Sequence, residues 1–314
     1  MNNYNLFSGT GKFYKGCLHC HSNNSDGMLT KEEIVSKYSE LGYDFLAITD
    51  HQYFTDYELE KEGNLLMIPG IEYGLRAAEY TKAYHFVGLR PWEDKKDENM
   101  YNGEKFARPT DKDSPQSMIN LLRERNNSVI LCHPVWSRLD PEDFKDLDGY
   151  FAFEVYNHLS EKKWHQGLSD IYWESLLMSG KKIWGVATDD AHHKHCNIKE
   201  QGGGWVMVKA DALTGRDIMK SLLSGKFYSS SGPTISVFEV INGTVYVECS
   251  PVKEIHFMTN TRGISVPGGI QVPVPCNNAI TSAEHKLKGD ENYIRVECVD
   301  SSGRTAWSNP IFFD

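Results

Sequence analysis

The segment GCLHCHSNNSDG, residues 16–27, places two histidines, His19 and His21, at the end of a short apolar run, and Asp26 follows closely. Because alternate residues of an extended strand point to one face, both imidazoles can reach the same ion or two neighbouring ions. Taken alone, such a pair is more often two partly exposed surface histidines. The meaning of the segment therefore depends on whether the rest of the chain supplies more groups of the same kind.

The composition is that of a folded protein with more than one domain. The chain has 314 residues, 40% hydrophobic and 24% charged, and this length favours one large domain with a smaller one. The amino terminus lacks the apolar core of a signal peptide, and no stretch approaches a membrane span. Seven cysteines, an odd number without a regular framework, fit a reducing compartment. We therefore predict a cytoplasmic protein that does not act in a membrane.

The formal net charge of −10 argues against a nucleic-acid partner. Residues 234–314 hold six Lys and Arg against nine Asp and Glu, or −3, which leaves −7 for the rest of the chain. Neither part offers the basic surface on which binding to a phosphate backbone depends. A small-molecule substrate is the predicted partner, and nothing in the sequence indicates the oligomeric state.

Strand-like and helix-like segments alternate over the first two-thirds of the chain. Thr30 and Glu33 form the capping box of a helix that ends near Gly42, and Ser114 with Pro115 opens another helix. Polar residues gather where the apolar strands end, which is where barrel enzymes place their chemistry. This order predicts an α/β fold with a parallel sheet closed as a barrel. The expected strands are 13–18, 45–48, 65–72, 84–89, 129–131, 151–155 and 183–187, and a third helix is expected around 168–178.

The pattern changes after YSSSGP, residues 228–233, into short alternating strands. Asn242 and Gly243 separate two of these strands and form the strongest short-range signal for a β-hairpin. No helical stripe follows, so an all-β, immunoglobulin-like sandwich is expected. We predict a barrel in residues 1–230 and a β-sandwich domain in residues 231–314 that contributes no metal ligand.

Nine residues with imidazole or carboxylate side chains fall at or just beyond the ends of the predicted strands. Such ligands, without thiolate, suit zinc, manganese or iron in a hydrolytic site. Nine groups exceed what one tetrahedral ion needs, so we predict two or three divalent metal ions. The candidate ligands are His19, His21, Asp26, His51, Glu72, His85, His133, Asp190 and His192.

Six separated motifs resemble, in order and in strand context, those of the PHP (polymerase and histidinol phosphatase) family of metallohydrolases. They are LHCHSNNSDG (18–27), ITDH (48–51), PGIE (69–72), HFVGL (85–89), CHP (132–134) and DDAH (189–192), and the resemblance covers about residues 13–233. It implies a distorted (β/α)7, TIM-like barrel with a dinuclear or trinuclear metal centre. Most characterised members are phosphoesterases. The whole chain looks most like members with a β domain after the barrel, a group that includes ester and carbamate hydrolases related to carbaryl hydrolase.

The resemblance also implies roles for the candidate ligands. His19 and His21 match the family's first ligand pair, Asp26 and His51 would hold a second or third ion, and Glu72 would bridge two ions. The remaining residues would close the site, although His85 is either a ligand or a hydrogen-bonded histidine on a buried strand. The predicted catalytic group comprises His19, His21, Glu72, Asp190 and His192.

Other polar residues near the motifs have two interpretations each. Asp50 and Asp189 are expected to orient histidines rather than to bind metal. Residues of the FEVYNH segment could contact substrate or a ligand, or could simply end a strand. The histidines that follow His192 are expected to stay solvated. Basic residues near the motifs could hold a phosphate or lie on an ordinary surface. These residues are Glu154, Tyr156, Asn157, His193, His195, Arg76, Arg138 and Lys163.

The predicted function is that of a metal-dependent phosphoesterase acting on a small phosphorylated substrate through a metal-bridging hydroxide. The first alternative is a metal-dependent hydrolase of carboxylic esters or carbamates, which would direct the same chemistry at a carbonyl carbon. The second is a non-catalytic protein that binds metal or carbohydrate. A substrate panel separates the first two.

Overall fold

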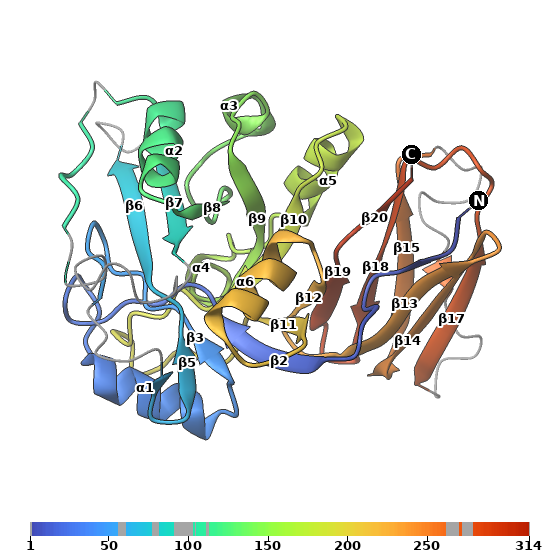
Figure 1. Cartoon of the computed structure of the whole chain (residues 1–314), viewed down its shortest axis with the longest axis horizontal. Helices are drawn as coiled ribbons and strands as arrows, with labels where there is room; N and C mark the ends of the chain where they lie inside the picture. The colour runs from blue at the N-terminus through green and yellow to red at the C-terminus, as the bar shows by residue number, and fades with distance from the viewer. Residues whose placement is uncertain are drawn as a thin grey trace.

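The computed structural model describes residues 2–55, 61–76, 82–90, 103, 105–110, 113–261, 270–271 and 279–313 (Figure 1). Residues 75–76 and 270–271 are described by their backbone only. The strands form three sheets, of four, five and eleven strands. Figure 1 shows α/β elements at the left and the carboxyl-terminal strands at the right.

The five-stranded sheet has the order β10-β9-β8-β7-β6. The pairs β8–β9 and β9–β10 are parallel, but β7 runs antiparallel to both β6 and β8, so the prediction of a parallel sheet is wrong for β7. The reason is chain length: six residues separate β6 from β7, and parallel neighbours need a crossover of about a dozen. The strands are β6 (Gly70–Arg76), β7 (Ala83–Leu89), β8 (Ser128–Leu131), β9 (Tyr150–Asn157) and β10 (Trp184–Thr188).

The amino-terminal half of the eleven-stranded sheet has the order β12-β11-β2-β3-β5-β4. Strands β2, β3 and β5 are parallel, whereas β11 is antiparallel to β2. The segment LLMIPGIE, predicted as one strand, is two strands in different sheets, because Pro69 has no N–H to continue a ladder. The strands are β2 (Lys12–Cys17), β3 (Phe45–Leu46), β4 (Lys61–Glu62), β5 (Leu65–Met67), β11 (Trp205–Ala210) and β12 (Phe227–Ser230).

Two isolated bridges join these two sheets. Cys20 pairs with Ala191 just beyond β2 and β10, and His51 pairs with Glu72. Both bridges are parallel and involve residues within or next to the predicted motifs. The carboxyl ends of β2, β3 and β10 and the first residues of β6 therefore meet in one place. The closed seven-stranded barrel itself stays a prediction.

The helices predicted from caps are confirmed. The Thr30 side chain accepts from the backbone N–H of Glu33 in a full capping box, and Gly42 follows with φ 71°. Ser114 caps the second predicted helix. No helix among the described residues is long and apolar enough to cross a membrane. The helices are α1 (Lys31–Glu40), α2 (Pro115–Glu124), α3 (Pro141–Phe144), α4 (His158–Trp164), α5 (Asp170–Met178) and α6 (Gly215–Leu223).

The carboxyl-terminal part consists of β strands, as predicted, and two sheets enclose its apolar core. Phe238 and Val247 from one sheet share this core with Phe257 and Val296 from the other. The Asn242–Gly243 turn has positive φ at both residues and joins β13 to β14, so the predicted hairpin is confirmed. The strands are β13 (Ile235–Ile241), β14 (Thr244–Val252), β15 (Glu254–Thr259), β16 (Ile270–Gln271), β17 (Ile280–Lys286), β18 (Tyr293–Val299), β19 (Thr305–Ser308) and β20 (Ile311–Phe312).

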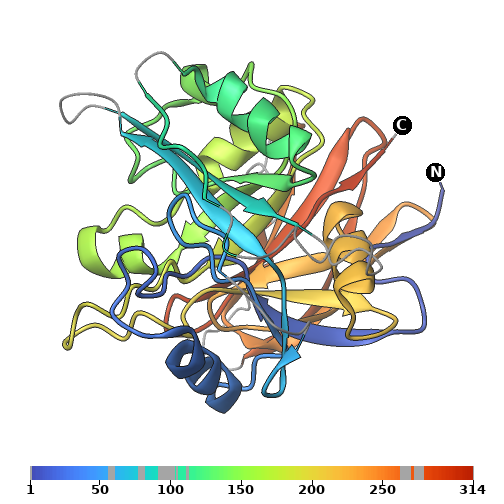
Figure 2. The ribbon, with the colours of Figure 1, turned by 60° about the vertical axis from the view of Figure 1, so that its left-hand side comes forward.

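The two parts are joined by backbone pairing rather than by a linker alone. β12 pairs with both β11 and β19, so one sheet runs from the α/β part into the β part. Figure 2 shows the gold strands β11 and β12 beside the blue strand β2. The amino-terminal strand β1 (Tyr4–Asn5) pairs with β13. The amino-terminal residues therefore belong physically to the carboxyl-terminal sandwich.

A buried ion pair fastens the same junction. Arg295 of β18, which is 1% exposed, donates from Nε and Nη2 to Oε2 of Glu174 on α5, at 2.9 and 2.5 Å. Its guanidinium also lies 4.7 Å from the ring centroid of Trp173. Glu174 and Trp173, both on α5, therefore contact the guanidinium of Arg295 from the β part.

Replacing Glu174 by alanine is expected to leave a buried guanidinium short of one partner. Because Arg295 keeps its ion pair with Glu297, we predict that Glu174→Ala lowers the free energy of unfolding by about 2 kcal/mol, the cost of lost charged hydrogen bonds. Glu142→Ala is the control, because that side chain is 77% exposed and its pair with Lys145 is worth less than about 1 kcal/mol. Urea unfolding measures both. Equal effects of the two substitutions would contradict a fastening role for the buried pair.

Candidate metal centre

The structure brings all nine predicted ligands together at the ends of strands from both sheets. His19 and His21 follow β2, Glu72 lies in β6, and the others follow or lie in β3, β7, β8 and β10. Clusters of ligand atoms within 4.8 Å of one another include eight of the nine, and the ninth, Asp190, lies 3.3 Å from His19 and 3.2 Å from His21. Whether each residue binds an ion stays a prediction.

The first group of atoms comes from His19, His21, Glu72 and Asp190. Nε2 of His19 and Nε2 of His21 are 3.2 Å apart. Glu72 Oε2 lies 3.4 and 3.2 Å from these nitrogens, and Asp190 Oδ1 lies 3.3 and 3.2 Å from them. Ligands about 2.1 Å from a tetrahedral ion stand about 3.4 Å apart. The four atoms therefore have the spacing of a single coordination sphere.

The second group uses the other oxygen of Glu72. Oε1 of Glu72 is 2.7 Å from Nδ1 of His85 and 3.2 Å from Nε2 of His133. Because Oε2 faces His19 and His21 while Oε1 faces His85 and His133, the carboxylate stands between two sets of nitrogens. A carboxylate that bridges two cations requires this position. His85, whose role the sequence left open, lies in the cluster.

The third group is more exposed to solvent. Asp26 Oδ1 is 3.2 Å from Nε2 of His192, 3.7 Å from Nε2 of His51 and 3.8 Å from Nδ1 of His21. Nδ1 of His21 and Oδ1 of Asp26 are both buried and have no hydrogen-bond partner within the described residues. Buried polar atoms are normally paired, so these two orphaned atoms fit a missing cation.

The imidazoles and carboxylates of the cluster stabilise one another's charged forms, which offsets the cost of burying those charges. Burial alone would lower the pKa of His21, but hydrogen bonds with Asp190 and Glu72 raise that pKa to about 10. Burial would raise the pKa of Glu72, yet the charges of His51, His85 and His19 hold it well below its usual range. The pKa of His51 is lowered to about 4, first by burial. Ionised carboxylates in a buried site favour any cation that can enter it.

Glu154 supports the cluster from behind, and the sequence did not separate this role from a polar strand end. Its Oε1 lies 2.7 Å from Nδ1 of His19, which leaves Nε2 of that ring facing the other ligands. Its Oε2 accepts from the backbone N–H of His133 at 2.8 Å and from Nδ2 of Asn157 at 3.1 Å. Asn157 also donates to Oδ2 of Asp190 at 3.2 Å. The buried Glu154 thereby orients His19 and His133 directly, and Asp190 through Asn157.

Asp50 and Asp189 do not orient histidines, so that prediction is wrong. Within the described residues, the Asp50 carboxylate accepts only from the segment 22–25 and from Thr55. Asp189 accepts from the backbone N–H groups of residues 202–204 and from tyrosine hydroxyls. Both aspartates instead hold the loops that carry or follow the motifs. The sequence showed two acids beside histidines but not which loops would reach them.

The weaker candidates are scattered around the centre. His193 and His195 are half-buried; Nε2 of His193 is buried, whereas the contact of His195 with Lys163 is exposed to solvent. Nζ of Lys163 lies 2.7 Å from Nε2 of His195. Arg138 is exposed, and the side chain of Arg76 lies outside the described residues.

An aromatic wall that the sequence did not indicate lies beside the histidines. The ring centroid of Trp136 is 4.9 Å from that of His133 and 5.9 Å from that of His85. The ring centroid of Trp164, a residue that is 39% exposed, lies 5.9 Å from that of Trp136. Trp136 comes three residues after His133 in CHPVW, and only the fold brings Trp164 next to it.

A model of the PHP domain family matches residues 18–125. The matched range contains six of the nine candidate ligands, and His133, Asp190 and His192 lie beyond it. Residues 18–125 are therefore similar to PHP domains. The centre described above thus combines residues of the matched range with residues that follow it.

The chain is similar to solved structures, one of which spans both of its parts. A two-domain protein from Bacteroides vulgatus ATCC 8482, which contains a predicted PHP-like metal-dependent phosphoesterase, is 15% identical, with a TM-score of 0.50 and 96% of each chain covered. A provisionally assigned metal-dependent phosphoesterase from Bifidobacterium adolescentis ATCC 15703 is 14% identical, with a TM-score of 0.45, covering 67% of this chain and 96% of its own. No curated protein matches the chain. At 15% identity the likeness to the first of these structures supports the two-domain fold alone.

Substituting Glu154 tests the support of the cluster. Glu154→Gln keeps the side-chain volume but removes the negative charge and one of two acceptor oxygens, so His19 and the backbone N–H of His133 can no longer both be satisfied. We expect affinity for zinc, measured by competition with a chelator, to fall about 10- to 100-fold. Glu248→Gln, on the exposed side of β14, should change nothing. Equal affinities in the two variants would show that Glu154 does not support the centre.

Proposed function

We propose that the PHP domain is a metal-dependent hydrolase, most specifically a phosphoesterase that acts on a small phosphorylated molecule. The observation that carries the proposal is the position of Glu72, whose two oxygens face different sets of imidazole nitrogens at 2.7 to 3.4 Å. A structural histidine cluster does not need a carboxylate shared in this way. A centre with more than one cation does.

The residues present fit two or three divalent ions of zinc, manganese or iron. His19, His21, Glu72 and Asp190 would hold one ion, Glu72 with His85 and His133 a second, and Asp26 with His51 and His192 a third. The orphaned Nδ1 of His21 and Oδ1 of Asp26 support the last group. Divalent ions there would lower the pKa of a water molecule and neutralise charge on phosphoryl oxygens.

The protein's own groups would orient the ligands and the substrate. Glu154 holds His19 in one ring orientation, and Ser137 lies 3.0 Å from Nδ1 of His133. Nζ of Lys194 lies 2.8 Å from Asp26 Oδ2 and puts a positive charge at the exposed side of the centre. Lys163, beside His195, provides another. These cations would attract an anionic substrate toward the metal ligands.

A second candidate is a hydrolase of carboxylic esters or carbamates. The observation in its favour is the wall of Trp136 and Trp164, which would suit an uncharged aromatic ester. The same metal chemistry serves a carbonyl carbon, so the centre itself does not discriminate. The positive charges of Lys163 and Lys194 favour a phosphorylated substrate, so the phosphoesterase is our first choice.

The β part is proposed to support the PHP domain without contributing metal ligands, with a boundary near residue 230. In the described residues after that point, no cluster of candidate ligands occurs. The six described cysteines are free thiols, which supports the predicted cytoplasmic location.

The first test concerns Glu72. Removing its carboxylate leaves facing cations with less negative charge between them, so Glu72→Ala should lose bound metal together with metal-dependent hydrolysis. Elemental analysis and turnover of p-nitrophenyl phosphate measure the two effects. His193→Ala should retain most of both, because its ring has no hydrogen bond or ring contact to the nine residues in the described part of the chain. Glu248→Ala controls for the loss of a glutamate. Full metal and near-normal turnover in Glu72→Ala would remove the basis of the proposal.

The second test concerns metal content and substrate class. We expect two or three transition-metal ions per chain, and hydrolysis of phosphate esters over carboxylic esters by at least about tenfold in kcat/KM. Zinc, manganese and iron are each restored to chelator-treated protein before both substrate panels are measured. A preference for aryl esters would favour the second candidate function. One ion or none after reconstitution would contradict the multinuclear centre.

A further inference from the structure

A cavity of about 460 Å³ lies where the PHP domain meets the β part. Its lining includes Tyr156 at the end of β9, Lys162 on α4 and Lys199 on the loop after the last motif. Ser231 and Arg304 come from the β part. None of the nine candidate metal ligands lines it. The cavity is therefore separate from the proposed metal centre, and both parts of the chain build it.

The charge of the lining has one sign. Lys162, Lys199 and Arg304 line the cavity, and no aspartate or glutamate does, although the whole chain has a formal charge of −10. Arg304 pairs with Asp300 at 2.7 Å, but neither lysine forms an ion pair within the described residues. Two lysines without an ion-pair partner among the described residues, beside a paired arginine, in an otherwise acidic protein create a local site for an anion.

Neutral groups give the cavity a fixed shape. His158 lies between Tyr156 and the loop, with Nδ1 3.0 Å from the Tyr156 hydroxyl and Nε2 3.0 Å from the carbonyl oxygen of Lys199. A Cβ at position 203 would come within 2.0 Å of this ring, so Gly203 is needed for the loop to approach it. The lysine on the loop is therefore held against α4 by a packed contact.

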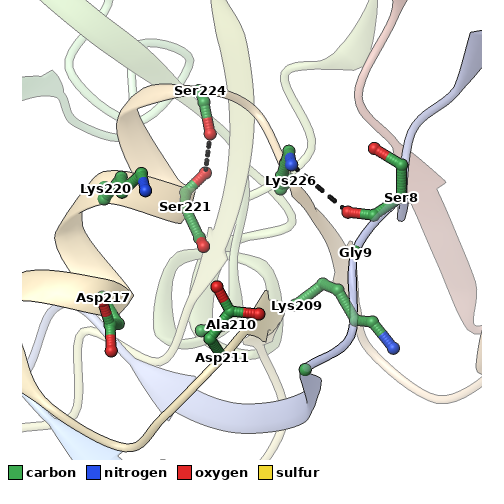
Figure 3. Close-up of a pocket in the computed structure, with 11 residues that line it drawn as sticks. Ser8, Gly9, Lys209, Ala210, Asp211, Asp217, Lys220, Ser221, Ser224 and Lys226 are labelled. Atoms are coloured by element: carbon green, nitrogen blue, oxygen red, sulfur yellow. Dashed lines mark hydrogen bonds between the residues drawn. The ribbon is translucent and has the colours of Figure 1, made fainter.

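The volume suits an organic molecule rather than an ion alone. Small-molecule sites commonly span about 300 to 1,000 Å³. Another hollow, of about 80 Å³, also carries lysines, but it includes Asp211 and Asp217, and Nζ of Lys226 donates to the carbonyl oxygen of Ser8 at 3.2 Å (Figure 3). That hollow is too small and too well neutralised for the same role.

We propose that the 460 Å³ cavity binds a small organic dianion, with Lys162, Lys199 and Arg304 facing its charged groups. Phosphate monoesters and dicarboxylates share this chemistry. The site goes beyond the proposed hydrolysis, because it needs none of the metal ligands.

The cavity is also connected to the metal centre through its walls. Tyr156 precedes Asn157, which donates to Asp190, and the backbone N–H groups of Gly202 and Gly203 donate to Asp189 at 2.7 and 2.8 Å. A bound dianion would restrain residues 156–157 and 202–203, which hold Asp190 and Asp189 by hydrogen bonds. Binding should therefore slow amide hydrogen exchange in residues 199–204.

Isothermal titration of the full chain, stripped of metal by a chelator, tests the proposal. The probes are glucose 6-phosphate and AMP as phosphate monoesters, succinate as a dicarboxylate, and glucose as an uncharged reference. We expect at least one dianion to bind with a Kd below about 1 mM and glucose not to bind. The double variant Lys162→Ala with Lys199→Ala should weaken that binding at least tenfold.

The control variant is Lys209→Ala with Lys220→Ala, which removes the same charge from the 80 Å³ hollow. It should bind like the parent chain, and the bound dianion should protect residues 199–204 from exchange in both proteins. Binding of the phosphate monoesters alone, or of succinate alone, would identify the chemical class of the dianion, and either result supports the site. Absence of binding by every dianion, or equal loss in the two double variants, would overturn it. Since metal is absent throughout, failure here leaves the proposed hydrolase untouched.

Discussion

The buried carboxylate of Glu72 is the group on which the rest of the centre depends. It is 1% exposed, and nitrogens of five histidines lie within 3.4 Å of its two oxygens. An ionised carboxylate in such a place is costly unless charged or hydrogen-bonding partners surround it. The strands that end here therefore have to end together. Two isolated bridges between the sheets, one of them from His51 to Glu72 itself, keep them in that register.

The backbone is also constrained where the ligands lie. His133 and Asp190 have positive φ, 26° and 52°, a region that non-glycine residues seldom adopt. Glu154 accepts from the backbone N–H of His133, and Asn157 donates to the side chain of Asp190. Unfavourable backbone conformations persist where surrounding contacts over-determine them, and they gather at functional sites. The same contacts direct His133 toward Glu72 and Asp190 toward His19 and His21.

Parts of the fold and of the centre could be predicted because their sequence signals are local. HxH at a strand end, the Thr30 capping box and the Asn242–Gly243 turn each depend on a few neighbouring residues, and the structure contains all three. The direction of β7 and the break at Pro69 were missed because apolar runs do not say which sheet a strand joins. The sequence left the role of Glu154 open and did not indicate Trp164, for a related reason. Their roles come from contacts between segments far apart in the chain, and no spacing in the sequence records such contacts.

The central claim is that these nine side chains hold a multinuclear metal centre. Anomalous diffraction from crystals of the zinc-reconstituted protein, collected on both sides of the zinc absorption edge, tests it most directly. The account predicts two or three anomalous peaks, with both oxygens of Glu72 facing peaks and Asp190 beside the peak shared by His19 and His21. A single peak away from Glu72, or no peak among these residues at full zinc loading, would contradict it.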